Sequence, residues 1–199
     1  GQGSILALGA EMKNTVTLFK DDYLVTSQYL GDMKDVRNLG YLEEALQSFR
    51  DLYCAEPEVV CCDLHPNFST TRLAERFGVP VVRVQHHVAH AFAVMAEHGL
   101  DPRESCLGVA FDGMGYGEDG HIWGGEFFVL SDGRPRQRWH FRYVPQPGGD
   151  LAAREPWRMA LSYLRDATGG APGTGVLREI PSKTIRAVTR ALDLGLNAP

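Results

Sequence analysis

The 199-residue sequence predicts an α/β fold built from two lobes, of which the second is incomplete. Its composition is that of a globular protein, with 44% hydrophobic and 23% charged residues, which excludes a fibrous or disordered chain. After an opening group of β-rich runs, strand and helix patterns alternate along the chain. A strand followed by a hairpin begins near Ile5 and again near Leu107. We therefore expect a first lobe over residues 1–100 and the start of a second over residues 101–199.

The first lobe is expected to open with three short strands and to continue with alternating helices and strands. Its clearest element is a helix from Val36 to Tyr53, where apolar residues recur every three or four positions and Asp35 is suited to cap the first turn. Gly78 and Gly99 are suited to end two shorter helices. The expected strands lie at residues 4–8, 15–20, 23–30, 59–62 and 79–84, and the shorter helices at residues 70–77 and 87–98.

The second lobe is expected to repeat the opening strands of the first. A strand at residues 106–111 runs into a glycine-rich turn at residues 112–117, and a second turn is predicted at residues 131–133. A glycine-rich loop then leads to a helix. The later strands and helices of the first lobe are not repeated after it. The other expected strands lie at residues 122–130 and 138–143, and the helix at residues 155–167.

Charge and cysteine usage narrow the class of protein. The formal net charge is −5 and the basic residues are scattered, so a nucleic-acid partner held by a basic stripe is not predicted. No apolar run reaches the length of about 18 residues that a membrane span needs, so no membrane partner is expected.

The four cysteines form no CxxC pair, which favours reduced thiols in a cytoplasmic protein over a disulfide framework. Because the chain begins at Gly1 rather than Met, we interpret it as a piece of a longer protein.

Three histidines within five residues are the strongest chemical signal. His86 and His90 are four residues apart, so on a helix they would lie on one face, one turn from each other. Two imidazoles at this spacing can hold one metal ion, and we favour metal ligation over a chance group of surface histidines. His87 would point about 100° away from that face, toward the substrate or the core. We include it among the candidate catalytic residues.

Asp112 follows a predicted central strand, at the end of the sheet where α/β folds bind ligands. Its carboxylate could complete a metal-binding set with His86 and His90, or orient a magnesium phosphate. Gly113 and Gly115 beside it would let a phosphate approach the backbone N–H groups. The alternative is a tight hairpin connection, because Asp-Gly pairs are common in turns.

Three other loops carry candidate binding residues. Lys13, in the turn after the first strand, is a second candidate catalytic residue and is suited to contact an anionic group, unless this turn is only a solvated hairpin tip. Gly148, Gly149 and Asp150 precede a helix, whose first backbone amides suit a phosphate or a ribose. His65 follows a buried strand and either organises its own loop or touches a ligand.

Seven segments, in the same order, resemble the carbamoyltransferase domain of the HypF family of hydrogenase maturation proteins. They extend over most of residues 5–165, and several are specific to this family within the wider group of carbamoyltransferases. The segments are GAEMKN (9–14), DLHP (63–66), VQHHVAH (84–90), FDGMGYG (111–117), IWGGEF (122–127), PGGD (147–150) and REPWRMAL (154–161).

The resemblance implies an actin/sugar-kinase/Hsp70-type fold, in which two ribonuclease-H-like lobes enclose a ligand cleft. It also implies that ATP and carbamoyl phosphate yield a carbamoyladenylate. The carbamoyl group then passes to the C-terminal cysteine of a partner protein, HypE, for synthesis of the cyanide ligand of nickel–iron hydrogenases. The residues that correspond to functional positions of the family are His86, His90 and Asp112 as metal ligands, Lys13 near the carbamoyl or phosphate group, and Gly149 and Asp150 as nucleotide contacts.

The resemblance leaves several points open. Histidine and carboxylate ligands favour iron or zinc over magnesium as the divalent ion. In the family, the second lobe continues beyond a segment like residues 197–199 with a further ligand aspartate and a nucleotide loop. We therefore expect this chain alone to bind ATP weakly and to be inactive. The alternatives to HypF-type transfer are a small-molecule O-carbamoyltransferase and a non-catalytic fragment that binds a metal or a partner.

Overall fold

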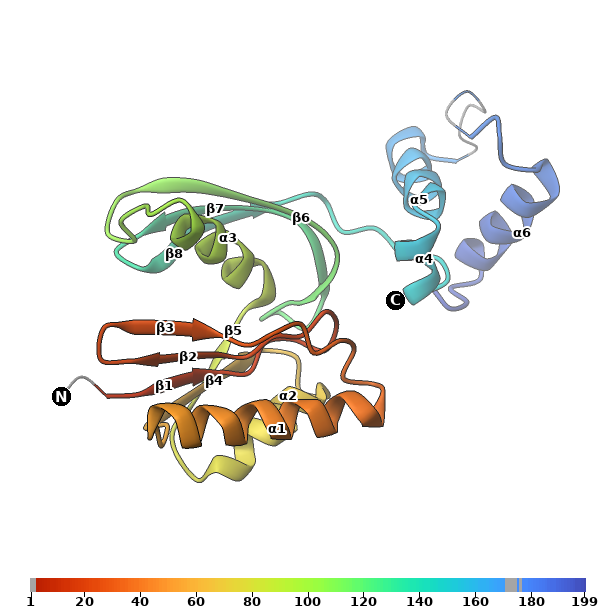
Figure 1. Cartoon of the computed structure of the whole chain (residues 1–199). Coiled ribbons are helices and arrows are strands. Elements are labelled where there is room, and N and C mark those ends of the chain that lie inside the picture. The colour runs from red at the N-terminus through yellow and green to blue at the C-terminus, as the bar shows by residue number, and fades with distance from the viewer. Residues whose placement is uncertain (1–2, 171–174, 176) are drawn as a thin grey trace. The chain divides into compact units, whose positions relative to one another are not determined.

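The computed structural model describes residues 3–170, 175 and 177–199. The chain divides into two compact units, Gly1–Trp139 and His140–Pro199 (Figure 1). The first unit contains the sheets and the second is helical, and this mixture confirms the predicted α/β class. The lobe boundary expected near residue 100 lies within the first unit and stays a prediction.

The first unit contains a five-stranded sheet. Its strands are β1 (Ile5–Ala7), β2 (Thr17–Lys20), β3 (Tyr23–Thr26), β4 (Val59–Asp63) and β5 (Val81–Val84). They lie in the order β3-β2-β1-β4-β5, and β1 is antiparallel to β2 but parallel to β4. The hairpin expected after the first strand is confirmed, because β2 pairs antiparallel with β3 and Asp21 between them has a φ of 53°.

Two helices and one short 3-10 helix cover one face of this sheet (Figure 1). They are α1 (Val36–Tyr53), α2 (Ser69–Ala74) and η1 (Glu75–Phe77). Leu42 and Phe49 of α1 are buried in one core with Val60 of the sheet. The predicted N-cap of α1 is confirmed, because the side chain of Asp35 accepts a hydrogen bond from the Arg37 amide at 3.0 Å.

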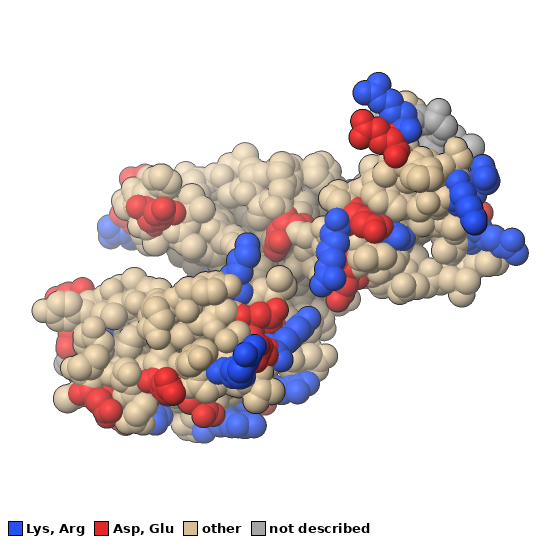
Figure 2. Space-filling model, turned by 45° about the vertical axis from the view of Figure 1, so that its right-hand side comes forward, with Lys and Arg blue, Asp and Glu red and all other residues tan. Residues whose placement is uncertain are grey.

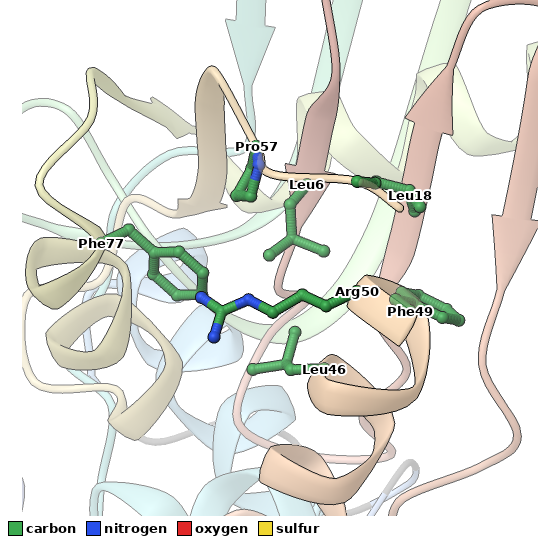
Figure 3. A pocket seen from close by; sticks show the side chains of 8 residues that line it. Leu6, Leu18, Leu46, Phe49, Arg50, Pro57 and Phe77 are labelled. Atoms are coloured by element: carbon green, nitrogen blue, oxygen red, sulfur yellow. The ribbon is translucent and has the colours of Figure 1, made fainter. Parts of the chain in front are cut away.

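A small cavity lies between α1 and the sheet (Figure 3). Apolar side chains such as Leu6 and Leu46 line it, and the guanidinium of Arg50 lies 5.8 Å from the centre of the Phe77 ring. Its volume of about 10 Å³ is room for about one water molecule. We interpret it as a packing gap in the core.

A three-stranded sheet and one more helix complete the first unit. The elements are α3 (His86–Glu97), β6 (Cys106–Tyr116), β7 (Ile122–Ser131) and β8 (Arg134–His140). The strands lie in the order β6-β7-β8, and α3 packs on them through Val88 and Met95, which share a core with Phe128. The predicted turn between β7 and β8 is confirmed, with positive φ values at Asp132 and Gly133.

The glycine-rich segment after Phe111 is not the turn that the sequence predicts. β6 continues through it, and the turn lies at residues 117–120. Phe111 pairs with Gly125 and the next pair is Gly115 with Trp123, so three residues oppose one in a β-bulge. The prediction was wrong because β7 pairs with β6 on both sides of the bulge, and this pairing overrides the local turn preference of an Asp-Gly pair.

A buried ion pair connects β7 to β8. Glu126 is only 1% exposed, and its carboxylate accepts a hydrogen bond from the Arg138 guanidinium at 2.7 Å. The same guanidinium lies over the Trp123 ring, 3.3 Å from its centre. Because a buried charge is costly without its partner, the Glu126 carboxylate depends on Arg138.

The second unit consists of helices in the part of it that the structure describes. They are α4 (Asp150–Arg154), α5 (Trp157–Thr168) and α6 (Ser182–Asp193). Leu161 of α5 and Val188 of α6 are buried in one core with Leu177. The helix predicted near residues 155–167 is thus confirmed, and it ends at Gly169, whose φ is 69°.

Charged side chains are distributed over both units. Figure 2 shows acidic and basic side chains interspersed on the visible face of each unit, among the residues that are described. None of the described helices combines the length and the apolar composition that a membrane span needs.

We expect Arg138→Met to lower the free energy of unfolding by about 3–5 kcal/mol, because it leaves the buried Glu126 carboxylate without its partner. Arg136→Met is the matched control on the same strand, since the Arg136–Asp132 pair is exposed and should contribute less than about 1 kcal/mol. Urea unfolding followed by circular dichroism measures both values. Equal losses in the two variants would contradict a special role for the buried pair.

Candidate metal centre

The candidate site lies where two parallel strands end. β4 pairs with β5 so that Asp63 is opposite Val84, at the carboxyl ends of both strands. Gln85 follows β5 directly and caps α3, and His86 is the first residue of this helix. The strand pairing therefore brings Asp63 next to His86, and the distance from Asp63 Oδ2 to His86 Nδ1 is 2.7 Å.

Three polar side chains converge at the start of α3. His86 Nε2 lies 3.1 Å from His90 Nε2 and 3.1 Å from Asp112 Oδ2. His90 Nε2 lies 3.9 Å from the same carboxylate oxygen. The structure thus brings together the three residues expected to hold a metal ion, with one ligand atom of each within 4.8 Å of the others.

This set of atoms fits a divalent metal ion. Tetrahedral zinc holds nitrogen ligands at about 2.0–2.1 Å, which separates two of them by about 3.3 Å. The 3.1 Å between the two Nε2 atoms is close to that separation. Two imidazoles with one carboxylate favour zinc or iron over magnesium, which prefers oxygen ligands.

The β-bulge orients Asp112 toward the helix. Asp112 Oδ1 accepts a hydrogen bond from the Gly113 amide at 2.6 Å, which leaves Oδ2 directed at the histidines. Bulges commonly re-aim a side chain out of the regular alternation of a strand. The β-bulge, in a segment expected from its sequence to be a turn, therefore brings this carboxylate to the site.

Asp63 is a candidate that the sequence analysis did not assign to the metal set. Its side chain is 5% exposed, and its Oδ1 accepts from the His65 amide at 2.8 Å while Oδ2 contacts His86. A carboxylate behind a ligand histidine fixes the ring and raises its basicity. The His65 ring stacks on Phe68 with centres 4.2 Å apart, so His65 organises the loop, which is one of its two expected roles.

These contacts shift the pKa values of the three converging groups. The carboxylates of Asp112 and Asp63 raise the pKa of His86 from 6.5 to about 9. The contacts with His86 and His87 hold the pKa of Asp112 well below its usual range. Burial, together with the nearby His86, lowers the pKa of His90. In the absence of a metal, His86 is therefore a cation between two carboxylates, and it must release a proton when it binds an ion.

His87 lies in the core and not on the face that His86 and His90 share. It is completely buried, and a Cβ atom at position 115 would lie 2.4 Å from its Cε1 atom. Gly115 is thus required for the packing of this ring. The catalytic role expected for His87, and the nucleotide contacts expected from Gly113 and Gly115, stay predictions.

The turn after β1 is held by its own polar side chains. The Glu11 carboxylate accepts from the Ser69 amide at 2.7 Å, at the first residue of α2. The amide group of Asn14 donates to the Leu8 carbonyl at 2.8 Å. Lys13 is exposed in this turn, with a φ of 50°. Its contact with an anionic group stays a prediction.

The second glycine-rich loop lies in the other unit. Gly148 and Gly149 have positive φ values of 95° and 54°, and α4 begins with Asp150. The Gly148 amide donates to the Asn197 carbonyl at 2.7 Å, and the Gly149 amide to the Gln146 carbonyl at 3.1 Å. Both amides thus have partners inside the unit. The nucleotide contacts expected from these two glycines and Asp150 stay predictions.

We expect the metal-free chain to lose stability between pH 6.5 and pH 9. The pKa of His86 is raised in the folded state, so its contribution is fully present below about pH 6.5 and is lost as the pH rises through about 9. For one proton, the free energy of unfolding cannot change by more than about 1.4 kcal/mol per pH unit. Urea unfolding at several pH values, with a chelator present, measures this pH dependence. His86→Gln is the control that should lack it. An unchanged slope in His86→Gln would assign the effect to another group.

Comparison with known proteins identifies the family. Residues 1–97 match the family described as "HypF Kae1-like domain", and residues 108–199 match "Carbamoyltransferase, Kae1-like Domain, second subdomain". Carbamoyltransferase HypF2 of Cupriavidus necator is 44% identical over 98% of this chain. Carbamoyltransferase HypF of Synechocystis is 42% identical over 82% of it. The chain spans only 24% and 21% of the lengths of these two relatives.

Two solved structures share the fold over nearly the whole chain. Full-length HypF in its phosphate- and nucleotide-bound form matches with a TM-score of 0.82 and 33% identity, over 99% of this chain and 31% of that one. HypF of T. kodakarensis matches with a TM-score of 0.80 and 33% identity, over 98% of this chain and 28% of that one. The resemblance predicted from the sequence is thus confirmed, and the chain belongs to the HypF family, as part of its Kae1-like carbamoyltransferase domain.

Proposed function

We propose that this chain supplies the metal-binding part of a HypF-type carbamoyltransferase. The observation that carries the proposal is the convergence of His86, His90 and Asp112, in a family whose curated relatives are named carbamoyltransferases. The two Nε2 atoms and Asp112 Oδ2 would hold a divalent ion, with iron or zinc favoured over magnesium. The activity of the whole protein is part of this proposal, because the chain spans about a quarter of these relatives.

Each residue of the site has a separate task. Asp63 holds Nδ1 of His86, so that Nε2 of this ring is presented to the ion. His90 presents a second nitrogen from the next turn of α3, and Asp112 adds a negative charge from the neighbouring strand. When bound, a divalent ion supplies a Lewis acid that polarises a carbamoyl or phosphoryl oxygen.

The proposed substrates are ATP and carbamoyl phosphate, which react by way of a carbamoyladenylate. One solved relative is described in a phosphate- and nucleotide-bound form, which supports ligands of this class here. The proposed acceptor is the C-terminal cysteine of HypE, in the cytoplasm, as a step of hydrogenase maturation. The residues proposed to contact these substrates are Lys13, for an anionic group, and Gly113, Gly115, Gly148, Gly149 and Asp150, for the nucleotide.

We expect His86→Ala and His90→Ala each to weaken Zn²⁺ binding by more than about a hundredfold. Each change removes one of two nitrogen ligands, which should exceed the 10- to 100-fold loss typical of changes behind a ligand. The matched control is His98→Ala, which removes a histidine at the opposite end of α3. Competition titration with a chromophoric chelator, together with the metal content of the dialysed protein, measures the affinity. An equal loss in the His98 variant would place the metal elsewhere.

We expect the complete gene product to transfer a carbamoyl group to a thiol in an ATP-dependent reaction. The assay contains carbamoyl phosphate and an acceptor peptide that ends in cysteine, and mass spectrometry detects the thiocarboxamide. His90→Ala should lower the rate by at least about a hundredfold, since the polarising ion is lost, while His98→Ala should not. Transfer to a small-molecule hydroxyl in place of the thiol would identify an O-carbamoyltransferase. Metal binding without any transfer would support a non-catalytic binding module.

A further inference from the structure

His87 is a buried titratable side chain that the proposed chemistry does not use. It stands between the helix that carries His86 and His90 and the bulge that carries Asp112, and it is 0% exposed. Its Nε2 atom has no hydrogen-bond partner among the described residues, and it lies 3.5 Å from Asp112 Oδ2, at the long limit of a hydrogen bond. Buried polar atoms are nearly always paired in folded proteins, so this contact requires an explanation.

Gln85 determines which nitrogen of His87 carries the proton. As the N-cap of α3, Gln85 accepts from the Val88 amide through Oε1 at 3.0 Å. Its Nε2 atom donates to the Tyr116 carbonyl at 3.3 Å and lies 3.3 Å from His87 Nδ1. The side-chain amide of Gln85 cannot be flipped by 180°. Its Oε1 atom would then face the Tyr116 carbonyl, and its Nε2 atom would face the Val88 amide N–H. His87 Nδ1 therefore faces a donor and is the nitrogen that accepts.

The proton of His87 consequently lies on Nε2, directed at the carboxylate of Asp112. We propose that His87 is a positioning residue, which donates from Nε2 to Asp112 Oδ2 and so holds this oxygen toward the metal ligands His86 and His90. The Val88 amide, Gln85, His87 and Asp112 then form one chain of hydrogen bonds that leads from the helix cap to the candidate metal site. Its effect on metal binding rests on the proposed function, whereas the position of the proton does not.

Packing around His87 supports a positioning role over a catalytic one. A Cβ atom at position 115 would lie within 3.0 Å of three ring atoms, so the backbone of Gly115 lies against the ring. The ring is thus enclosed between α3 and β6 and has no exposed surface. It can reach the site through Asp112, whose side chain is partly exposed.

The position of the proton can be measured directly in the metal-free chain. Long-range ¹H–¹⁵N correlation spectra distinguish protonated from unprotonated ring nitrogens of histidine, and His87→Gln identifies the signals of His87 by their disappearance. We expect a proton on Nε2 and an unprotonated Nδ1. A proton on Nδ1 would overturn the assignment made from Gln85.

Zn²⁺ affinity tests the effect on the site. His87→Leu fills the space without a donor, and we expect binding about 10- to 100-fold weaker than in the wild-type chain. His87→Gln places an amide N–H near the position of Nε2 and should bind within about threefold of wild type. Full affinity in the leucine variant would overturn the proposal. An equal loss in the glutamine variant would also overturn it, because the ring shape and not the donor would then matter.

These experiments separate the inference from the proposed function. If the wild-type chain binds no Zn²⁺, the proposed metal site fails, while the NMR spectra still decide which ring nitrogen of His87 carries the proton. If His87→Leu does not fold, which its circular dichroism spectrum shows, the glutamine variant decides the outcome. Tight binding by that variant together with a proton on Nε2 in the wild type supports the proposal, and weak binding overturns it.

Discussion

The parallel pairing of β4 with β5 is the constraint on which the candidate site depends. It ends both strands at one edge of the first sheet, so the carboxylate of Asp63 and the first turn of α3 meet there. No loop separates β5 from α3 except the single capping residue Gln85. The orientation of His86 is therefore determined by the sheet itself, which is a more rigid support than a loop provides.

α3 joins this edge to the second sheet. Its first residues form the site beside the first sheet, while Val88 and Met95 pack into the core of the second. Asp112 arrives from that second sheet, on a strand that bulges toward the helix. The candidate ligands thus come from two sheets that share one helix, and the fold of both is needed before the three side chains can converge.

Features that depend on neighbouring residues were predictable from the sequence. The helix from Val36 to Tyr53, its cap at Asp35 and the hairpin at Asp21 follow from periodicity and turn chemistry. The spacing of His86 and His90 was enough to place both on one helical face, because one turn of helix separates them.

Features that depend on strand pairing could not be predicted in this way. Asp63 contacts His86 across 23 residues, and only the order of the strands brings the two together. The bulge at Asp112 exists because β7 pairs on both sides of it, and the burial of His87 follows from that same bulge. Local preferences favoured a turn at this place, so the prediction failed where long-range pairing dominates.

The two histidines of the candidate metal set differ in their access to solvent. The His86 side chain is 21% exposed and is held by Asp63, whereas the His90 side chain is 59% exposed. An ion held between them would thus have one anchored ligand and one ligand that solvent can reach. If the proposed ion is bound there, it would exchange through this exposed side without unfolding of the chain. The protein would then fold before it acquires the metal, so that local supply as well as ligand chemistry would decide which ion is bound.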